Sequence, residues 1–297
     1  MKYMQNILNV LKESFIEITN LLRHHNSLEL SEITNNSNAT GDKIKKLDFM
    51  SNVLIKNKLL TCKNIRTIAS EEEDTLLETD NREGDYMVSY DPIDGSSNIG
   101  VNITVGTIFC IFKYNNNQIS DGRNIVMSGY SLYGSSTQLV LGYIDKVHKL
   151  DLFILNKNNE FILVKPNHKM PREGNQYAIN HCNQYKWINT NITIFIESLI
   201  KKNKTQRWVG SLVADAHRTL IKGGVFIYPI TSNLINGKIR LIYEAYPMAF
   251  IFKCAGGYSY DETKCILNKP FPNNIHEKTS ILLFGKYEFN LYKNLTY

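Results

Sequence analysis

Two aspartates stand three residues apart where an apolar, strand-like run ends, in residues 90–98 (Y-D-P-I-D-G-S-S-N). Carboxylates held as close as those of Asp91 and Asp94 repel each other unless a cation neutralises them. Oxygen ligands with this spacing suit Mg²⁺, which binds a few carboxylates together with water and substrate phosphate. The next residues offer backbone N–H groups and hydroxyls that favour phosphate: Gly95, Ser96 and Ser97. The segment predicts adjacent metal and phosphate sites, although Asp94-Gly95 alone is also typical of a hairpin turn.

A second acidic run, Glu71 to Glu73, follows another strand-like stretch at residues 65–69. Such a run alone is equally typical of a solvated loop. Hydrolysis of a phosphate ester by water, however, needs metal ions to activate the water and to neutralise the phosphoryl group. The combination of the two acidic segments therefore favours metal-assisted phosphoryl chemistry.

Composition narrows the class of protein. The chain has 297 residues, 43% of them apolar and 21% charged, which predicts a soluble globular protein of one large domain or two packed halves. The net charge of +6 is spread along the chain, so we expect small anionic ligands and no nucleic acid. No apolar run approaches a membrane-spanning length of about 20 residues, so we expect no membrane association. Five cysteines without a C-x-x-C pair and an N-terminus without a signal peptide predict a reducing, cytoplasmic location.

Hydrophobic periodicity predicts a mixed order of elements. We expect helices over residues 7–22, 44–59, 211–222 and 247–255, a loop over 34–42, strands over 65–69, 86–90, 103–114, 161–165, 225–228 and 239–243, and a helix or strand over 191–198. This alternation predicts a layered α/β (α+β) fold. The polar stretch 165–175 suggests a boundary between an N-terminal half, residues 1–168, and a C-terminal half, residues 169–297.

The sequence also resembles a known family, the class I fructose-1,6-bisphosphatases. The matching stretches follow the family's order and lie at residues 41–48, 69–72, 91–99, 105–109, 133–137, 210–218, 237–244 and 247–250. The D-P-x-D-G-S motif is shared with the wider superfamily of inositol phosphatases. The motifs G-S-S-N-I, Y-G-S-S-T and G-S-L-V-A-D-x-H-R are much narrower.

The resemblance implies a five-layer αβαβα sugar phosphatase fold and hydrolysis of the 1-phosphate of fructose 1,6-bisphosphate, a step of gluconeogenesis. It implies two or more Mg²⁺ ions per subunit and a homotetramer. By motif match, the metal ligands are Glu71, Glu72, Asp91, the carbonyl of Ile93, Asp94 and Glu244, and the catalytic residues are Glu72, which helps to polarise the attacking water, and Asp48. The substrate-binding residues are Asp94, Gly95, Ser96 and Ser97 near the 1-phosphate, and Asn180, Trp208, Tyr228, Lys238 and Tyr243 near the sugar and 6-phosphate, with Arg207 supplied by a neighbouring subunit.

Some of these residues also have purely structural interpretations. Tyr228 and Tyr243 end apolar runs and are typical of core aromatics. Lys238 follows Asn-Gly and is typical of a solvated hairpin. His217 and Arg218 lie on an amphipathic helix, where we expect a structural role.

The chain departs from the family pattern at four positions. Val53 and Gly100 replace two aspartates of the catalytic environment, Trp208 replaces a tyrosine at the 6-phosphate, and Asp85 stands where the AMP site usually has a lysine. The two missing carboxylates predict slow turnover. They also favour an alternative, a catalytically impaired family member that binds sugar phosphates. Another alternative is a related phosphatase acting on sedoheptulose 1,7-bisphosphate or an inositol phosphate.

Overall fold

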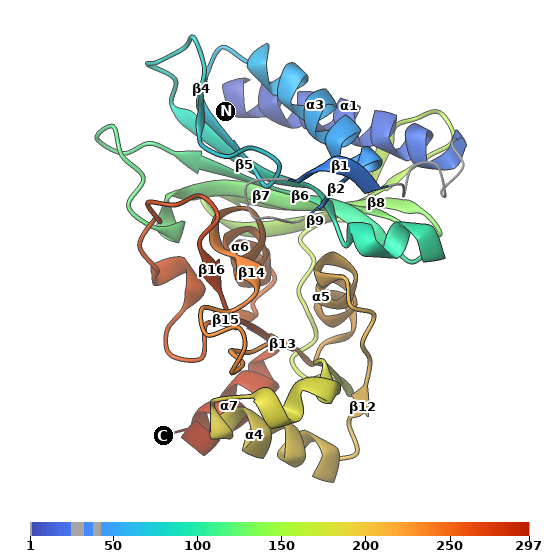
Figure 1. Cartoon of the computed structure of the whole chain (residues 1–297), viewed down its shortest axis with the longest axis vertical. Helices are drawn as coiled ribbons and strands as arrows, with labels where there is room; N and C mark the ends of the chain where they lie inside the picture. The colour runs from blue at the N-terminus through green and yellow to red at the C-terminus, as the bar shows by residue number, and fades with distance from the viewer. Residues whose placement is uncertain (1, 25–32, 38–42, 297) are drawn as a thin grey trace.

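The fold consists of five alternating layers of helices and sheets. The structure is a computed structural model that describes residues 2–24, 33–37 and 43–296. Figure 1 shows helices α1 (Lys2–His24) and α3 (Lys46–Leu60) on one outer face, followed by a large sheet, a middle helical layer, a smaller sheet and a second outer helical layer. This is the αβαβα arrangement that the family resemblance implies.

The large sheet has eight strands in the order β10-β9-β8-β7-β6-β5-β3-β4. Their bounds are β3 (Ile65–Ser70), β4 (Leu77–Glu78), β5 (Tyr86–Asp94), β6 (Val105–Lys113), β7 (Ile125–Tyr133), β8 (Thr137–Asp145), β9 (Val147–Leu155) and β10 (Phe161–Lys165). Strands β3 and β5 are parallel neighbours, so both strands end at the same edge of the sheet. The buried stripe of α1, which includes Leu11, Phe15 and Ile18 at helical spacing, packs in one hydrophobic cluster with α3 and this sheet.

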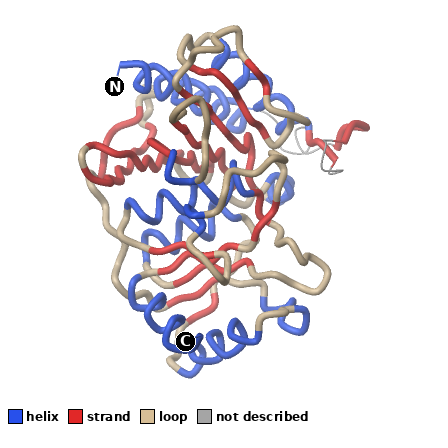
Figure 2. Tube along the Cα trace, turned by 90° about the vertical axis from the view of Figure 1, so that its left-hand side faces the viewer, coloured by secondary structure: helices blue, strands red, loops and turns tan. Residues whose placement is uncertain are grey.

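The smaller sheet has five strands in the order β12-β11-β13-β17-β15. Its strands are β11 (Gln176–Ala178), β12 (Thr205–Gln206), β13 (Val225–Tyr228), β15 (Tyr258–Tyr260) and β17 (Ile281–Phe284), with α4 (Thr190–Lys201) and α7 (Lys286–Thr296) packed on its outer face. Figure 2 shows the same alternation of helix and strand from the side. The large sheet ends in sequence at β10 and the small one begins at β11, but the division into two domains at residue 168 stays a prediction.

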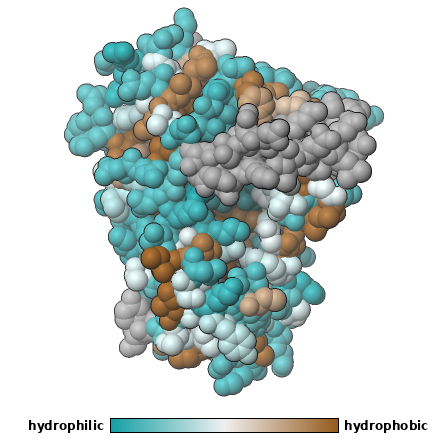
Figure 3. All heavy atoms as spheres, in the orientation of Figure 1, coloured by the Kyte–Doolittle hydropathy of each residue, from teal (hydrophilic) through white to brown (hydrophobic). Residues whose placement is uncertain are grey.

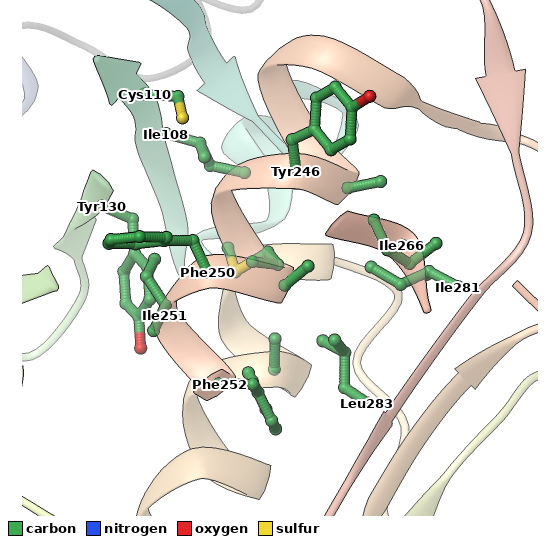
Figure 4. Close-up of a cluster of buried hydrophobic side chains, with 14 of the residues drawn as sticks. Ile108, Cys110, Tyr130, Tyr246, Phe250, Ile251, Phe252, Ile266, Ile281 and Leu283 are labelled. Carbon is green, nitrogen blue, oxygen red and sulfur yellow. The ribbon is translucent and has the colours of Figure 1, made fainter. Parts of the chain in front are cut away.

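The main core lies between the two sheets, around α5 (Leu212–Lys222) and α6 (Tyr246–Cys254). Figure 4 shows Phe250, Ile251 and Phe252 of α6 between side chains of the large sheet and those of β17. Because both sheets cover α6, its side chains are apolar on nearly every side. The helix has Pro247 in its first turn and is followed by Gly256 with φ 84°, which matches the predicted start and stop of this helix.

Residues 191–198, which the sequence left open between helix and strand, belong to helix α4. Asn189 caps it by accepting a hydrogen bond of 3.0 Å from the backbone N–H of Asn191. Its buried residues recur at helical spacing: Ile192, Phe195, Ile196 and Leu199.

Two predicted elements are wrong. The expected loop 34–42 contains the strand β1 (Ile33–Ser37), which pairs antiparallel with β2 (Lys43–Lys45), while residues 38–42 lie outside the described residues. The stretch is polar and rich in turn-forming residues, so its sequence gives no strand signal. The expected strand 239–243 is reduced to β14 (Ile239–Arg240), which pairs with β16 (Lys278–Thr279), and the chain then enters a π-helix, η4 (Leu241–Ala245).

Most of the surface that Figure 3 shows outside the grey atoms is hydrophilic, and hydrophobic groups there are small and separate. Among the described residues, none of the helices has the length and hydropathy needed to span a membrane. All five cysteines are free thiols.

Candidate active site

The two aspartates of the D-P-I-D segment lie at a β-bulge in β5. Asp91 is opposite Ile108 of β6 and Asp94 is opposite Gly106, so three steps on β5 match two on β6. In a regular strand, residues three apart point to opposite faces, and one extra residue brings them back to the same face. Pro92 stands inside the bulge and donates no backbone hydrogen bond, while its carbonyl accepts 2.7 Å from Thr107 Oγ1. The bulge therefore explains how Asp91 and Asp94 reach one cavity.

Gly95 turns the chain from β5 into a short 3₁₀ helix, η1 (Ser96–Val101), so Asp94-Gly95 is not a hairpin turn. Its φ of 82° lies in the left-handed region, and a Cβ there would stand 2.8 Å from Ser211 Oγ. Only glycine satisfies both conditions without strain. The first N–H groups of a helix have no acceptor within it. The N–H groups of Ser96 and Ser97 can therefore donate to an acceptor outside the helix, such as a phosphate oxygen.

The other carboxylates of the cavity come from three elements. Glu71 and Glu72 follow β3, the parallel neighbour of β5, and Asp48 lies in the first turn of α3. Glu244 lies in the π-helix η4, where its Oε2 accepts a hydrogen bond of 2.5 Å from the backbone N–H of Arg240. Strand ends, a helix start and a π-helix thus converge on one acidic cluster.

Asp91, Asp94 and Glu244 each offer a carboxylate oxygen within 4.8 Å of the other two, and all three are buried. Burial, with the charges of Glu71, Asp94, Glu244 and Asp48, raises the pKa of Asp91 well above its usual range. Burial also raises the pKa of Asp94 to about 7, although Val213 N–H (2.7 Å) and Ser211 Oγ (3.2 Å) both donate to its Oδ2. Burial and then the charge of Glu71 raise the pKa of Glu244. These carboxylates therefore repel each other in the absence of a cation.

The donor set fits a hard divalent cation. It consists of carboxylate oxygens at the spacing of a shared ion, and among the described residues no hydrogen bond goes to Oδ1 of Asp94. The buried Arg240 lies beside the cluster, with its Nε 3.9 Å from Glu71 Oε1. A guanidinium at that distance balances part of the charge of Glu71.

The cavity has a volume of about 310 Å³, and part of its lining is aromatic. Trp208 stacks on Phe226 with the ring planes 8° apart, and its ring lies 5.8 Å from that of Tyr228. Lys238 Nζ lies 5.3 Å from the centre of the Tyr228 ring. Gly237, which precedes this lysine, has φ 80° and lies close to β16. A Cβ on Gly237 would lie 2.1 Å from the carbonyl carbon of Thr279. The cavity therefore combines an acidic cluster with the Lys238 cation and aromatic faces.

Most of the predicted site residues line this cavity together: Asp48, Glu71, Glu72, Asp91, Ile93, Asp94, Gly95, Ser96, Ser97, Trp208, Tyr228, Lys238 and Glu244. Three do not. Tyr243 is fully buried and its hydroxyl lies 2.7 Å from His276 Nδ1, Asn180 caps a 3₁₀ helix by accepting from Cys182 N–H, and Arg207 is exposed. The roles of all these residues stay predictions.

The cavity also contains residues that sequence reasoning missed: Gly210, Leu212, Phe226 and Ile239. Phe226 stands two residues before Tyr228 on β13, and residues two apart share a face of a strand. That period was a usable signal for Phe226. Gly210 and Leu212 lie inside the G-S-L-V-A-D motif, which gives no separate signal that these two residues line a cavity.

Val53 and Gly100, where the family resemblance implies aspartates, lie outside the cavity lining. Gly100 is exposed in η1, three residues after Ser97. Val53 is half-buried on α3, five residues after Asp48.

Comparisons with known proteins agree with this fold. The family described as "Fructose-1-6-bisphosphatase, N-terminal domain" matches residues 2–166, and "Fructose-1-6-bisphosphatase, C-terminal domain" matches residues 170–295. A Sulfurihydrogenibium protein named fructose-1,6-bisphosphatase class 1 is 42% identical over 87% of this chain and 80% of its own. The cytosolic fructose-1,6-bisphosphatase of Arabidopsis thaliana is 37% identical over 88% of this chain and 79% of its own.

The crystal structure of Leishmania major fructose-1,6-bisphosphatase in holo form has a TM-score of 0.91 to this chain, with 33% identity. The match covers 99% of this chain and 94% of the Leishmania chain. A layered α/β fold with a carboxylate cluster at a strand bulge places the chain among the sugar phosphatases of this architecture. More narrowly, the chain belongs to the fructose-1,6-bisphosphatase family.

Proposed function

We propose that this protein is a divalent-metal-dependent phosphatase that removes the 1-phosphate of fructose 1,6-bisphosphate, giving fructose 6-phosphate and phosphate. One observation carries the proposal: a single cavity is lined both by the carboxylate cluster and by Lys238 with Tyr228. A bisphosphate suits this combination, because one phosphate reacts at the metal-binding carboxylates while the other binds the lysine. Family membership supports the same substrate.

Mg²⁺ is the cation that this donor set suits best, with Glu71, Glu72, Asp91, Asp94, Glu244 and the carbonyl of Ile93 as its ligands. When bound, divalent cations would lower the pKa of a water molecule and neutralise charge on the phosphoryl group. A set of this many acids suits two or more ions.

The chain's own residues have separate tasks in this proposal. The backbone N–H groups of Ser96 and Ser97 orient the 1-phosphate, and the Glu72 carboxylate accepts a proton from the attacking water. Lys238 Nζ binds the 6-phosphate, and the faces of Trp208 and Tyr228 cover the sugar and exclude water. Binding energy at the 6-phosphate then helps to orient the reacting bond.

A phosphate-release assay tests the proposal. Purified protein with fructose 1,6-bisphosphate and Mg²⁺ should release phosphate, excess chelator should stop the reaction, and fructose 1-phosphate should be a weaker substrate because it cannot engage Lys238. Equal rates with chelator would contradict the proposal. Faster release from sedoheptulose 1,7-bisphosphate or an inositol phosphate would instead favour a related activity.

A second candidate function is a sugar-phosphate-binding protein with little turnover. Val53 and Gly100 favour it, because each lacks a carboxylate that the family uses around the attacking water. Calorimetry distinguishes the two candidates: micromolar binding of fructose 1,6-bisphosphate together with no measurable phosphate release would identify the binding protein.

A homotetramer in the cytoplasm completes the proposal. The edge strand β10 exposes three consecutive apolar side chains, with exposed fractions of 47% for Ile162, 46% for Leu163 and 51% for Val164. Exposed apolar residues on an unpaired edge favour association with another chain. The free thiols of all five cysteines support a reducing compartment.

A further inference from the structure

Asn52 is a buried amide of α3 whose hydrogen bonds connect three elements of the acidic site. Its Oδ1 accepts from Ser70 Oγ at 2.8 Å and from the Tyr90 hydroxyl at 2.7 Å, and its Nδ2 donates to Glu73 Oε1 at 2.7 Å. The side chain is almost fully buried, with 3% of the residue exposed. Every one of these partners belongs to β3, to β5 or to the acidic run after β3.

Each partner of Asn52 is next to a carboxylate of the cluster. Ser70 immediately precedes Glu71, and its Oγ also accepts 3.2 Å from the backbone N–H of Glu72. Tyr90 immediately precedes Asp91, and its carbonyl accepts 3.2 Å from the backbone N–H of Glu71. Asn52 itself stands four residues after Asp48, on the same face of α3.

A second branch of the network reaches the remaining ligand. The carbonyl of Glu73 accepts 2.9 Å from His276 Nε2, so Nδ1 of the neutral ring accepts 2.7 Å from the Tyr243 hydroxyl. Burial lowers the pKa of His276, which agrees with a neutral ring. Tyr243 immediately precedes Glu244. The network therefore contacts the chain beside Glu71, Asp91 and Glu244.

We propose that Asn52 is a positioning residue that fixes the spacing of the metal-binding carboxylates, through Ser70 and Tyr90 directly and through Glu73 and His276 at Glu244. The inference rests on the proposed function and deepens it, because it assigns a role to a residue that does not line the cavity. The fully buried Tyr243 contributes to the site through this network.

The physical reason is the mutual repulsion of the cluster. Without a cation, the carboxylates of α3, β5 and η4 and those that follow β3 lower their energy by moving apart, and a cation must then bring them together again. An amide can accept two hydrogen bonds and donate two, so Asn52 can hold α3, β3 and β5 at one distance without adding charge. Groups that orient metal ligands in this way typically change metal affinity by about 10- to 100-fold when removed.

The test compares Asn52→Ala with Ser128→Ala. Ser128 is also fully buried and donates to Phe109 O at 2.9 Å and Pro247 O at 3.2 Å, but it lies outside the network. Metal-free protein is titrated with Mg²⁺ in a calorimeter, and with Mn²⁺ by loss of the free-ion EPR signal, without substrate. Circular dichroism and thermal melts report the fold of each variant, and steady-state assays separate kcat from KM.

We expect Asn52→Ala to bind both ions about 10- to 100-fold more weakly, with a lower kcat at subsaturating metal and little change in KM for the sugar bisphosphate. Ser128→Ala should lose thermal stability but bind metal within about twofold of the parent. Tyr90→Phe, which removes one hydroxyl of the network, should weaken metal binding in the same direction and decides the question if Asn52→Ala does not fold.

Unchanged metal affinity in folded Asn52→Ala would overturn the inference, as would equal losses of affinity in Ser128→Ala. If Asn52→Ala does not fold and Tyr90→Phe binds metal like the parent, the inference is also overturned. A parent protein that binds no divalent cation would remove the proposed function as well. A parent that binds metal and turns over, beside an Asn52→Ala variant of equal affinity, would remove the inference alone.

Discussion

Asp94 shows how a residue can stabilise the metal-bound protein and destabilise the metal-free one. Its folded-state pKa is raised to about 7, first by burial, so the carboxyl is easier to ionise in the unfolded chain than in the folded one. This group's contribution to stability is therefore complete at low pH and is lost as pH rises from its unfolded pKa through about 7. A bound cation reverses that loss by stabilising the charged form.

Replacing Asp94 by asparagine should separate the two effects. The amide oxygen can still accept from Val213 N–H and Ser211 Oγ, so the fold should persist while the charge is lost. In chelator, we expect Asp94→Asn to melt several degrees above the parent at pH 8 and near the parent at pH 4. In saturating Mg²⁺ the order should reverse, and kcat should fall by about a thousandfold or more.

Thermal melts at both pH values, with and without metal, measure this prediction. Asp145→Asn is a matched control, because Asp145 is an exposed carboxylate paired with Lys149 far from the cluster in sequence. If metal-free Asp94→Asn is less stable than the parent at pH 8, repulsion among the carboxylates is not what limits the stability of the metal-free protein.

Gly100 is the more accessible of the two positions without a family aspartate. It is exposed in η1, whereas Val53 is half-buried on α3. A new carboxylate at Val53 would lose part of its hydration and destabilise the fold. We expect Gly100→Asp to raise kcat by about tenfold or more and to leave KM nearly unchanged, because the group acts on the attacking water. Gly100→Asn, which has the same shape without the charge, should show no such gain in steady-state assays. Equal rates for the parent and a folded Gly100→Asp would mean that another residue already supplies this function.

At the scale of elements, α5 holds the loop that carries Trp208. The fully buried Asp215 accepts hydrogen bonds from the backbone N–H groups of Val209 (3.0 and 3.1 Å) and Gly210 (2.9 Å). Arg218 pairs with Asp215 and donates 2.7 Å to the carbonyl of Arg207. One helical turn therefore orients the whole segment 207–210 against the cavity.

This arrangement predicts that substitutions at Asp215 change KM for the substrate more than kcat. Asp215→Ala should raise KM for fructose 1,6-bisphosphate by about tenfold while metal affinity stays unchanged, because segment 207–210 brings Trp208 to the cavity and contains no carboxylate. Asp215→Asn should recover part of the loss, since its amide oxygen still accepts from the loop. Initial rates over a range of substrate concentrations, with metal titrations of each variant, measure both quantities. A loss confined to kcat would contradict the assignment.

The sequence predicts these elements to different degrees, for physical reasons. Strongly periodic segments such as α1 and α5 follow from hydrophobic spacing. The π-helix η4 does not, because residues 239–243 form a short apolar run that is typical of a buried strand. The acidic cluster could be predicted from runs of acids after strands. The network of Asn52 and His276 could not, because single polar residues carry no spacing signal.

At the scale of the whole molecule, the sheet edge at β10 predicts association. The apolar side chains of Ile162, Leu163 and Val164 would be buried in an oligomer, and burial of apolar surface favours association by about 25 cal/mol per Å² before its entropic costs. Light scattering at micromolar concentration should give a tetramer. Leu163→Lys should lower the mass, whereas Lys157→Glu, at an exposed loop position before β10, should not. A monomeric parent would contradict the assignment.

Arg207 is exposed, so in such an oligomer it can reach the cavity of a neighbouring subunit. Each active site would then contain residues of two subunits. Arg207→Ala should then have intact metal sites but a raised KM, and Asp91→Asn should have no turnover but an intact Arg207. When the two variants are unfolded together and refolded, hybrid oligomers contain some sites with both the metal cluster of one subunit and the arginine of the other. At low substrate concentration, the mixture should therefore be more active than the sum of the two variants refolded separately. Arg172→Ala, at another arginine outside the cavity lining, replaces Arg207→Ala in the control mixture and should give no such gain. Strictly additive activity in a mixture whose hybrids are demonstrated by mass spectrometry would place Arg207 outside the neighbour's site, and the 6-phosphate would then depend on Lys238 and the aromatic wall of the same chain.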